Sequence, residues 1–430
     1  MSLGYLWLFV VLLALGMPIA FVLLIAPGLS LVIDGLDTRF FSKLLSTLFT
    51  GMYSFPLMAI PFFILAGDIM NHGGITRNIV RFSETVIGHI RGGLAQVNIL
   101  SSILFAGLSG SAVADTSALG KMLIPAMEEN GYTRRFSAAV TAASSVIGPI
   151  IPPSGIMIIY AFVMNVSVAG LFLSGFVPGL MIGGGLMLMT VYLARKRNYP
   201  VATEKATWRE CGLAFKDAFW ALLTPVILLG GILGGVFTPT EAAAVAAFYA
   251  FIVSLFVMRT LRFKDLPEIF ISTAIQSGVI LFLVGAAVTF GWIITISGLA
   301  REGAAFVQSL TDNVNLLLFL VNLLLFLVGM FLDAGPAILI LGPVLEPIFV
   351  DQLGLHPLHF AIVMCVNVTV GLATPPMGLV LFVASSVSGE KVEKIAYEML
   401  PFLAVEVGVI FLITFFPVLT LTLPRLFGFA

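Results

Sequence analysis

The stretch GPIIPPSG at Gly148–Gly155 decides the architecture of this chain, because a close copy returns as GLATPPMG at Gly371–Gly378. The two Pro-Pro pairs are 223 residues apart (375 minus 152), and an apolar run follows both. A Pro-Pro pair cannot lie inside a regular helix, because each ring removes a backbone donor and clashes with the preceding turn. Within hydrocarbon, such freed backbone groups are tolerated only where protein or a polar cavity surrounds them. Two broken helices in matching positions of two halves indicate the binding site of a secondary transporter.

The composition predicts a protein with many membrane spans. Of the 430 residues, 60% are hydrophobic and 10% are charged, whereas soluble domains carry roughly 25% charged residues. The mean hydropathy is +1.12. We expect the first span at Leu6–Ile25, kinked at Pro18, because this run lacks the basic flank and the short apolar core of a signal peptide. A net charge of −1 argues against nucleic acid as a partner.

Two stretches rich in Lys and Arg, 195–217 and 259–268, divide the chain. The positive-inside rule places both in the cytoplasm. We expect residues 1–194 to form a first repeat half that contains scaffold helices, a hairpin and the first Pro-Pro break. Residues 269–430 would form a second half with the same contents. Residues 195–268 would hold cytoplasmic loops and connecting helices.

The segment between these basic stretches, 218–258, suits two spans joined by the turn GGVFTPTE. Thr238 can cap the second helix, Pro239 suits the first helical position, and Glu241 comes three residues after the cap. This spacing predicts a capping box, and it explains Glu241 better than an ion-binding role does.

Each half also carries a polar patch about 40 residues before its Pro-Pro pair. The first patch reads FAGLSGSAVADT at Phe105–Thr116, and the second reads FLDAGPA at Phe331–Ala337. A short apolar helix, a polar tip and a second short helix predict a re-entrant hairpin. The non-helical backbone of such a tip needs protein or water around it.

The first patch offers hydroxyl and carboxylate oxygens, which are the ligands that hard cations such as Na⁺ prefer. Small residues could instead only let helices pack closely. Asp115 favours the functional interpretation because intramembrane carboxylates are costly, although it could also lock or cap the hairpin. Asp333 could simply cap the helix that follows it. Thr374 adds a hydroxyl directly before the second Pro-Pro pair.

Neither ATP-driven transport nor enzymatic chemistry is indicated. Gly120-Lys121 lacks the earlier Gly and the following Ser or Thr of a phosphate-binding loop. The four histidines lack the spacing of a helical metal site, and no nucleophile–base pair emerges.

Together these motifs resemble the large membrane subunit of tripartite ATP-independent periplasmic (TRAP) transporters. The likeness covers essentially the whole chain, and it rests on Ile60–Gly67, Gly107–Asp115, Gly148–Ser154, Gly234–Glu241 and Gly371–Pro376. It implies an all-α polytopic protein of the bacterial inner membrane, of the elevator type in the ion-transporter superfamily. The fold would contain an inverted repeat with two re-entrant hairpins and two unwound helices.

The resemblance also implies roles for individual residues. Ser109–Asp115 would lie at the cytoplasm-facing hairpin tip and Asp333–Pro336 at the opposite tip. The two Pro-Pro breaks would complete two Na⁺ sites that flank the substrate. The implied Na⁺ ligands are Ser109, Gly110, Ser111, Asp115, Gly148, Pro152, Asp333, Gly371, Thr374 and Pro375. The implied substrate-binding residues are Ser109, Ser111, Ser154, Gly335 and Thr374.

The implied function is Na⁺-coupled uptake, without ATP, of an organic acid delivered by a periplasmic substrate-binding protein. Sialic acid, another sugar acid and a C4-dicarboxylate are the expected substrates, and the Ala-Asp-Thr continuation at residues 114–116 favours the sugar acids. A small four-helix membrane subunit is expected as a separate chain. Two alternatives remain open: a stand-alone Na⁺- or H⁺-coupled carboxylate carrier, and a scaffold subunit that transports nothing.

Overall fold

The computed structural model is helical in the part of the chain that it describes, and no strand occurs there. Seven of the described helices are long and apolar enough to cross a membrane. The prediction of an all-α polytopic membrane protein is therefore confirmed. The described residues are 4–33, 39–199, 205–299, 302, 311 and 313–430.

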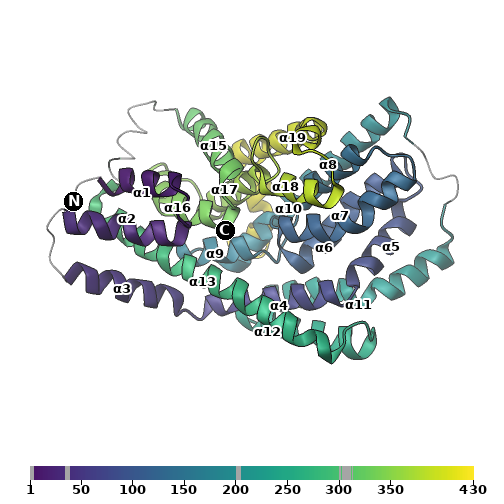
Figure 1. Ribbon diagram of the computed structural model, residues 1–430, viewed down its shortest axis with the longest axis horizontal. Helices are drawn as coiled ribbons and strands as arrows, with labels where there is room; N and C mark the ends of the chain where they lie inside the picture. Colours follow the sequence, from purple (N-terminus) through teal and green to yellow (C-terminus); the bar gives the residue numbers. More distant parts are fainter. Residues whose placement is uncertain (1–3, 34–38, 200–204, 300–301, 303–310, 312) are drawn as a thin grey trace.

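One group of helices, here called the frame, includes the helices along the lower side of Figure 1 and the purple pair at its left edge. It consists of α1 (Gly4–Ala14), α2 (Ile19–Ile33), α3 (Arg39–Met52), α4 (Ala59–His72), α5 (Ile75–Ile87), α11 (Trp208–Leu233), α12 (Pro239–Ile252) and α13 (Leu266–Ser297). Helix α12 packs on α4, α11 packs on α5, and the long α13 crosses α2, α3 and α4. Polar contacts tie these pairs together: Thr273 Oγ1 donates to Asp68 Oδ2 at 3.3 Å, and Arg81 pairs with Asp217 at 3.3 Å.

The remaining helices form a second body, here called the core bundle. Its first half contains α6 (Gly93–Ser109), α7 (Ala112–Glu129), α8 (Arg134–Ser145), α9 (Gly155–Val163) and α10 (Val168–Lys196). Its second half contains α15 (Val314–Phe331), α16 (Ala334–Glu346), α17 (Pro357–Gly371), α18 (Leu379–Ser388), α19 (Val392–Phe415) and α20 (Val418–Leu426). As predicted, both Pro-Pro pairs interrupt a helix, between α8 and α9 and between α17 and α18.

The two halves of the core bundle exchange their short broken helices. Helix α9 of the first half packs on α16 and α17 of the second half, whereas α18 of the second half packs on α7 and α8 of the first. The long helices α10 and α19 also pack together. Each half thus repeats the same order of elements, and the exchange makes the two halves one packed body.

Equivalent buried hydrogen bonds tie each hairpin to its broken helix. In the first half, Asn98 Nδ2 donates to Thr141 Oγ1 at 2.7 Å, and Ser144 Oγ donates to Asn98 Oδ1 at 3.3 Å. In the second half, Asn367 Nδ2 donates to Asn322 Oδ1 at 2.6 Å. Ser144 and Asn367 are 223 residues apart (367 minus 144), which is the offset of the two Pro-Pro pairs. The internal repeat therefore extends to the contacts between helices.

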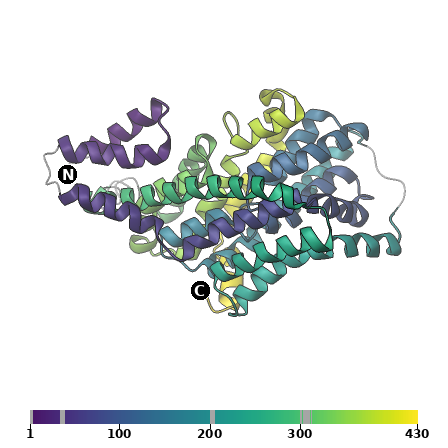
Figure 2. The same cartoon turned by 60° about the horizontal axis from the view of Figure 1, so that its bottom comes forward.

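The predicted single span at Leu6–Ile25 is wrong. Helix α1 (Gly4–Ala14) ends before α2 begins, and the two helices pack against each other as a hairpin, drawn in purple in Figure 2. The physical reason is local: Gly16 has a φ of +81° and Pro18 follows two residues later. A left-handed residue followed by proline ends a helix, whereas proline alone can kink one.

The predicted turn between α11 and α12 is confirmed. Thr238 Oγ1 accepts from Glu241 N at 3.3 Å, Glu241 Oε2 accepts from Thr238 N at 2.8 Å, and Pro239 is the first residue of α12. Helix α11 begins at Trp208, earlier than the expected start at residue 218, because Thr207 and Glu210 form another capping box there. Residues 200–204 of the expected connecting segment lie outside the described residues.

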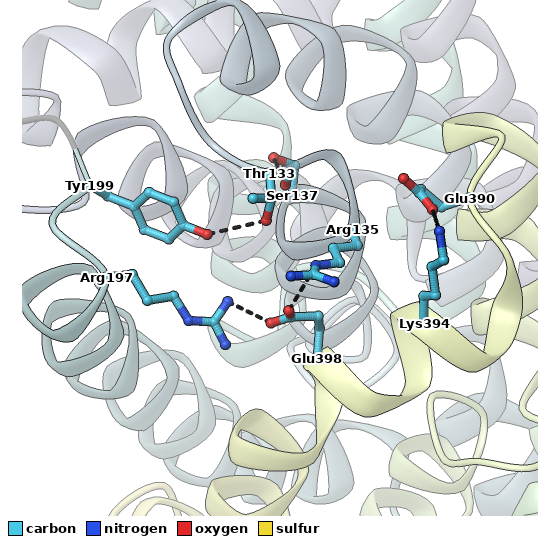
Figure 3. Close-up of polar contacts among 8 residues, drawn as sticks. All are labelled: Thr133, Arg135, Ser137, Arg197, Tyr199, Glu390, Lys394 and Glu398. Carbon is cyan, nitrogen blue, oxygen red and sulfur yellow. Dashed lines mark hydrogen bonds and ion pairs between the residues drawn. The ribbon is translucent and has the colours of Figure 1, made fainter.

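A buried carboxylate joins three helices at the basic end of the core bundle (Figure 3). Glu398 of α19 pairs with Arg135 of α8 at 3.1 Å and with Arg197, just after α10, at 2.6 Å. The Glu398 side chain is 6% exposed, and the Arg197 guanidinium also lies over the Phe136 ring at 5.4 Å. Because arginine forms directional hydrogen bonds with carboxylates, this clamp fixes the ends of the three helices relative to one another.

We expect Glu398→Gln to lower the free energy of unfolding by about 2 kcal/mol, because the charge-assisted hydrogen bond from Arg197 and the ion pair with Arg135 lose their anion. The partial exposure of both arginines keeps the cost below that of a fully buried broken pair. Glu390→Gln is the matched control, because its pair with Lys394 is a surface i,i+4 contact at 3.4 Å. Unfolding of the detergent-purified variants measures both effects, and equal losses would contradict the clamp.

Candidate functional site

The tip of the first hairpin is the two-residue turn Gly110-Ser111 between α6 and α7. Gly110 has a φ of +61°, a left-handed conformation that favours glycine at the end of a helix. Ser111 then adopts an extended backbone, and its Oγ accepts from Ala114 N at 3.4 Å as the N-cap of α7. Ser111, expected as a Na⁺ and substrate ligand, therefore also has a structural role at the tip.

Asp115 locks this hairpin. Ser109, the last residue of α6, donates its Oγ–H to Asp115 Oδ1 in the first turn of α7, and Ser111 N donates to Ser109 Oγ at 3.2 Å. Asp115 is fully buried, and its second oxygen, Oδ2, has no hydrogen-bond partner among the described residues. The interpretation of Asp115 as a hairpin lock is confirmed, and the lock uses only one of the two carboxylate oxygens.

The hairpin tip lies directly against the first Pro-Pro break. A Cβ atom added to Gly148 would overlap Asp115 Oδ2, and one added to Gly110 would lie 2.9 Å from Pro153 O. Pro152 O lies 3.7 Å from the corresponding Cβ position of Gly107 in α6. The tertiary structure thus brings together the first group of expected ligands, from the hairpin and from the break.

Ser154 ends the same break and is fully buried. Its Oγ accepts from Met157 N at 3.4 Å, which makes Ser154 the N-cap of α9. This arrangement mirrors Ser111 at the start of α7, so two serines expected to bind substrate both start helices. A serine before an apolar helical run is a recognised N-cap signal, and it could have predicted this role.

The residues around Asp115 fit a hard cation. An unpartnered buried carboxylate oxygen is costly in an apolar interior unless a cation or a donor reaches it. The neighbouring groups are a serine hydroxyl and the carbonyls of an irregular backbone, which are oxygen ligands of the kind that such cations take. No cluster of three or more His, Cys, Asp or Glu side chains that could hold a metal occurs in the described part of the chain. One carboxylate with backbone oxygens is therefore the cation-binding chemistry that this site offers.

The expected ligands of the second half make fewer contacts with one another than those of the first half. Asp333 Oδ1 accepts from Ala334 N at 2.7 Å and caps α16, as the alternative interpretation predicts. Thr374 is buried and donates its Oγ1–H to Val370 O at 2.9 Å, so its oxygen lone pairs stay available. A Cβ on Gly371 would lie 2.6 Å from Gly329 Cα, which shows how closely α15 and α17 approach. Gly335 has open space around its Cβ position.

No hydrogen bond joins Asp333 to Thr374 or Pro375 in the described part of the chain. The packing explains the difference from the first half: α15 packs closely on α17 but only weakly on α16, whereas α6 and α7 pack closely together. The second helix pair is therefore splayed. Its polar tip lacks the lock that Ser109 and Asp115 provide in the first hairpin.

Sequence reasoning missed the polar residues that support the site. Thr116 Oγ1 lies 2.6 Å from Ser145 Oγ, which ties α7 to α8 one residue after Asp115. Ser102 Oγ donates to Ser144 Oγ at 2.8 Å and extends the chain of contacts that begins at Asn98. Buried hydroxyls inside apolar helices are a weak signal alone. The 223-residue spacing of Ser144 and Asn367 would have distinguished them from ordinary helix-packing residues.

Comparisons with known proteins agree on one family. The family model described as "Tripartite ATP-independent periplasmic transporter, DctM component" matches residues 6–419. The large permease protein of a sialic acid TRAP transporter from Vibrio cholerae is 38% identical over 413 residues, covering 96% of each chain. The large permease protein of a 2,3-diketo-L-gulonate TRAP transporter from Escherichia coli is 39% identical over 405 residues, covering 94% of each chain.

The fold is also found in a solved structure. The YdaH transporter of Alcanivorax borkumensis superposes with a TM-score of 0.65 over 88% of this chain and 89% of that one. The two sequences are 18% identical, so the likeness concerns the fold alone.

We expect Gly148→Ala to lower the free energy of unfolding by roughly 1–3 kcal/mol, because the added methyl group must displace the Asp115 carboxylate. The matched control is Gly155→Ala, because nothing lies within 4 Å of its Cβ position at the start of α9. Alanine there is expected to be neutral or slightly stabilising. Thermal unfolding of both variants tests the contact, and an unchanged midpoint for Gly148→Ala would refute it.

Proposed function

The chain belongs to the TRAP transporter family as its DctM component, the large permease, and from this we propose Na⁺-driven uptake of an organic acid as its function. In this proposal, the organic acid and Na⁺ bind near the tip of the first hairpin and the two Pro-Pro breaks during transport. The chain would act in the bacterial inner membrane, together with a small four-helix membrane subunit and a periplasmic substrate-binding protein. The transporter permeases of this family give no reason to expect an enzymatic step.

The observation that carries the proposal is the free oxygen of Asp115 at the contact between hairpin and break. Na⁺ is taken up with the substrate in this proposal, and its charge would offset that of the buried carboxylate. Ser109, Asp115 and the backbone at Gly148 would hold it. Thr374 and the backbone at Gly371 and Pro375 would serve a second Na⁺.

The elevator movement is proposed from the division into two bodies. The exchanged helices α9 and α18, together with the Glu398 clamp, favour movement of the core bundle as a unit. The frame has its own internal contacts, so it can serve as the stationary part. Movement of a rigid body around an intact site would keep the ligands of Na⁺ and substrate together during transport.

The proposed substrate is a hydroxylated organic acid. The relatives from V. cholerae and E. coli are named for sialic acid and 2,3-diketo-L-gulonate, and both compounds combine a carboxylate with hydroxyl groups. The cap residues Ser111 and Ser154, with Ser109, Gly335 and Thr374, offer hydroxyl and backbone groups to such a substrate. A C4-dicarboxylate is the other substrate class within this proposal.

We expect Asp115→Asn to weaken the Na⁺ activation of uptake by about tenfold or more, since 1.4 kcal/mol of lost binding corresponds to tenfold. Asparagine keeps the acceptor for Ser109 but removes the charge. Asp68→Asn is the control, because Asp68 is a hydrogen-bonded carboxylate of the frame. Uptake of labelled sialic acid or succinate is measured in proteoliposomes that contain the chain, its small subunit and the binding protein, with and without an inward Na⁺ gradient.

The same assay separates the alternatives. Uptake by the chain without its partners would support a stand-alone carrier. A folded protein that shows neither uptake nor a Na⁺-dependent shift in unfolding temperature would support a scaffold role. Normal Na⁺ activation of the Asp115→Asn variant would overturn the assignment of the ion site, and loss of its membrane expression would make Asp115 structural.

A further inference from the structure

A cavity of about 350 Å³ lies far from the first hairpin, where the start of α15, the start of α17 and the α19–α20 junction meet. Its size falls in the range of small-molecule sites. The polar residues that line it are Asn315, His356, His359, Thr414 and Arg425.

The cavity lies at the end of the core bundle opposite the Glu398 clamp. Helix α19 runs from Val392, near the clamp, to Phe415 at the cavity. Its 24 residues span about 36 Å at 1.5 Å per residue, which exceeds the hydrocarbon thickness of a bilayer. The Cβ position of Gly170, in the first turn of α10, lies 3.2 Å from Phe429 beyond α20, whereas α10 ends in the basic residues near the clamp. The cavity thus lies at the non-cytoplasmic end of these helices.

Two side chains of the cavity can bind a carboxylate. Arg425 is exposed, and no carboxylate of the described residues lies within the 4.0 Å ion-pair limit. Its planar guanidinium matches the two oxygens of a carboxylate. His356 Nδ1 accepts from Leu358 N at 3.2 Å, so a neutral ring carries its proton on Nε2 as a donor. Burial and the charge of Arg425 lower the pKa of His356, which favours this neutral form.

A third side chain provides an acceptor. His359 is 2% exposed, and its Nδ1 lies 2.8 Å from Thr420 Oγ1. When the Thr420 hydroxyl donates to Pro417 O at 3.0 Å, His359 Nδ1 donates to the hydroxyl oxygen. His359 Nε2 is then an acceptor, and it has no hydrogen-bond partner in the described part of the chain. A buried acceptor without a donor is costly unless a ligand or water supplies one.

We propose that this cavity is a receiving site for a hydroxylated carboxylic acid on the non-cytoplasmic face, with the carboxylate on Arg425 and His356 and a hydroxyl donating to His359 Nε2. Its role in uptake rests on the function proposed above, whereas the binding itself does not. The site is distinct from the hairpin site, because it needs no cation. An anionic lipid phosphate shares the attraction to Arg425, and competition with lipid nanodiscs distinguishes it from a carboxylic acid.

Direct binding tests the site in the purified chain with its small subunit, in choline buffer without Na⁺. The probes are gluconate, hexanoate, which has the same carbon number but no hydroxyl groups, and glucitol, which has no carboxylate. We expect gluconate to bind more tightly than the other two. Arg425→Gln should weaken gluconate binding by about tenfold or more, because the charge-assisted hydrogen bonds to the carboxylate are lost. Arg209→Gln, an exposed arginine of the opposite end, is the control and should leave binding unchanged.

His359→Leu isolates the hydroxyl contact. It should abolish the preference for gluconate over hexanoate while hexanoate binding stays within about twofold, since the carboxylate contacts are intact. Unchanged gluconate binding in Arg425→Gln would overturn the site. So would binding that requires Na⁺, or displacement of gluconate by nanodiscs of phosphatidylglycerol but not of phosphatidylcholine.

The two sites can fail independently. A Na⁺-dependent shift in unfolding temperature and Na⁺-activated uptake report on the hairpin site, and both should persist in Arg425→Gln, which also shows that this variant folds. Gluconate binding in choline reports on the cavity and should persist in Asp115→Asn. If the unmodified chain binds no gluconate but keeps its Na⁺ response, only the receiving site is overturned. If the unmodified chain binds gluconate but shows no Na⁺ response, only the proposed Na⁺ coupling is overturned.

Discussion

The contact between Asp115 and Gly148 is the constraint on which the rest of the site depends. Gly148 has no side chain, so the break in the first broken helix can approach the buried carboxylate directly. Ser109 holds one oxygen of that carboxylate and so fixes the two hairpin helices at their tip. The other oxygen stays without a described partner at the irregular backbone. A bulkier residue at either position would separate the hairpin from the break, and the oxygen ligands would no longer meet.

The surrounding helices enclose the backbone groups that lose their helical hydrogen bonds at the two Pro-Pro pairs. Each pair ends a helix and frees backbone groups, which are tolerated in an apolar environment only where protein surrounds them. The exchange of α9 and α18 between halves provides this cover, because each short helix is packed within the opposite half. The buried hydrogen bonds of Asn98 and Asn322 then hold the hairpin helices beside the broken helices. A polar, irregular centre is stable because it is enclosed on all these sides.

The core bundle has chemically different ends. At the basic end, Glu398 pairs with two arginines and joins three helices. At the other end, Arg425 has no ion-pair partner among the described residues, and it lines a cavity where the start of α15, the start of α17 and the α19–α20 junction meet. A charged side chain that is paired within the protein joins helices, whereas a charged side chain without a partner can bind a ligand. This difference is the physical basis for assigning a clamp to one end and a receiving site to the other.

The sequence by itself determined the features that depend on neighbouring residues. The prolines at 152–153 and 375–376 require helix breaks, Thr238 with Glu241 requires a helix start, and the composition requires membrane helices. Only the tertiary structure decided that Asp115 keeps a free oxygen at Gly148 and that His359 borders a cavity. Helix breaks and helix caps depend on steric clashes and hydrogen bonds between residues close in sequence. The order and spacing of residue types therefore predict them. Which side chains meet across distant segments follows from packing, and a one-dimensional pattern does not contain that information.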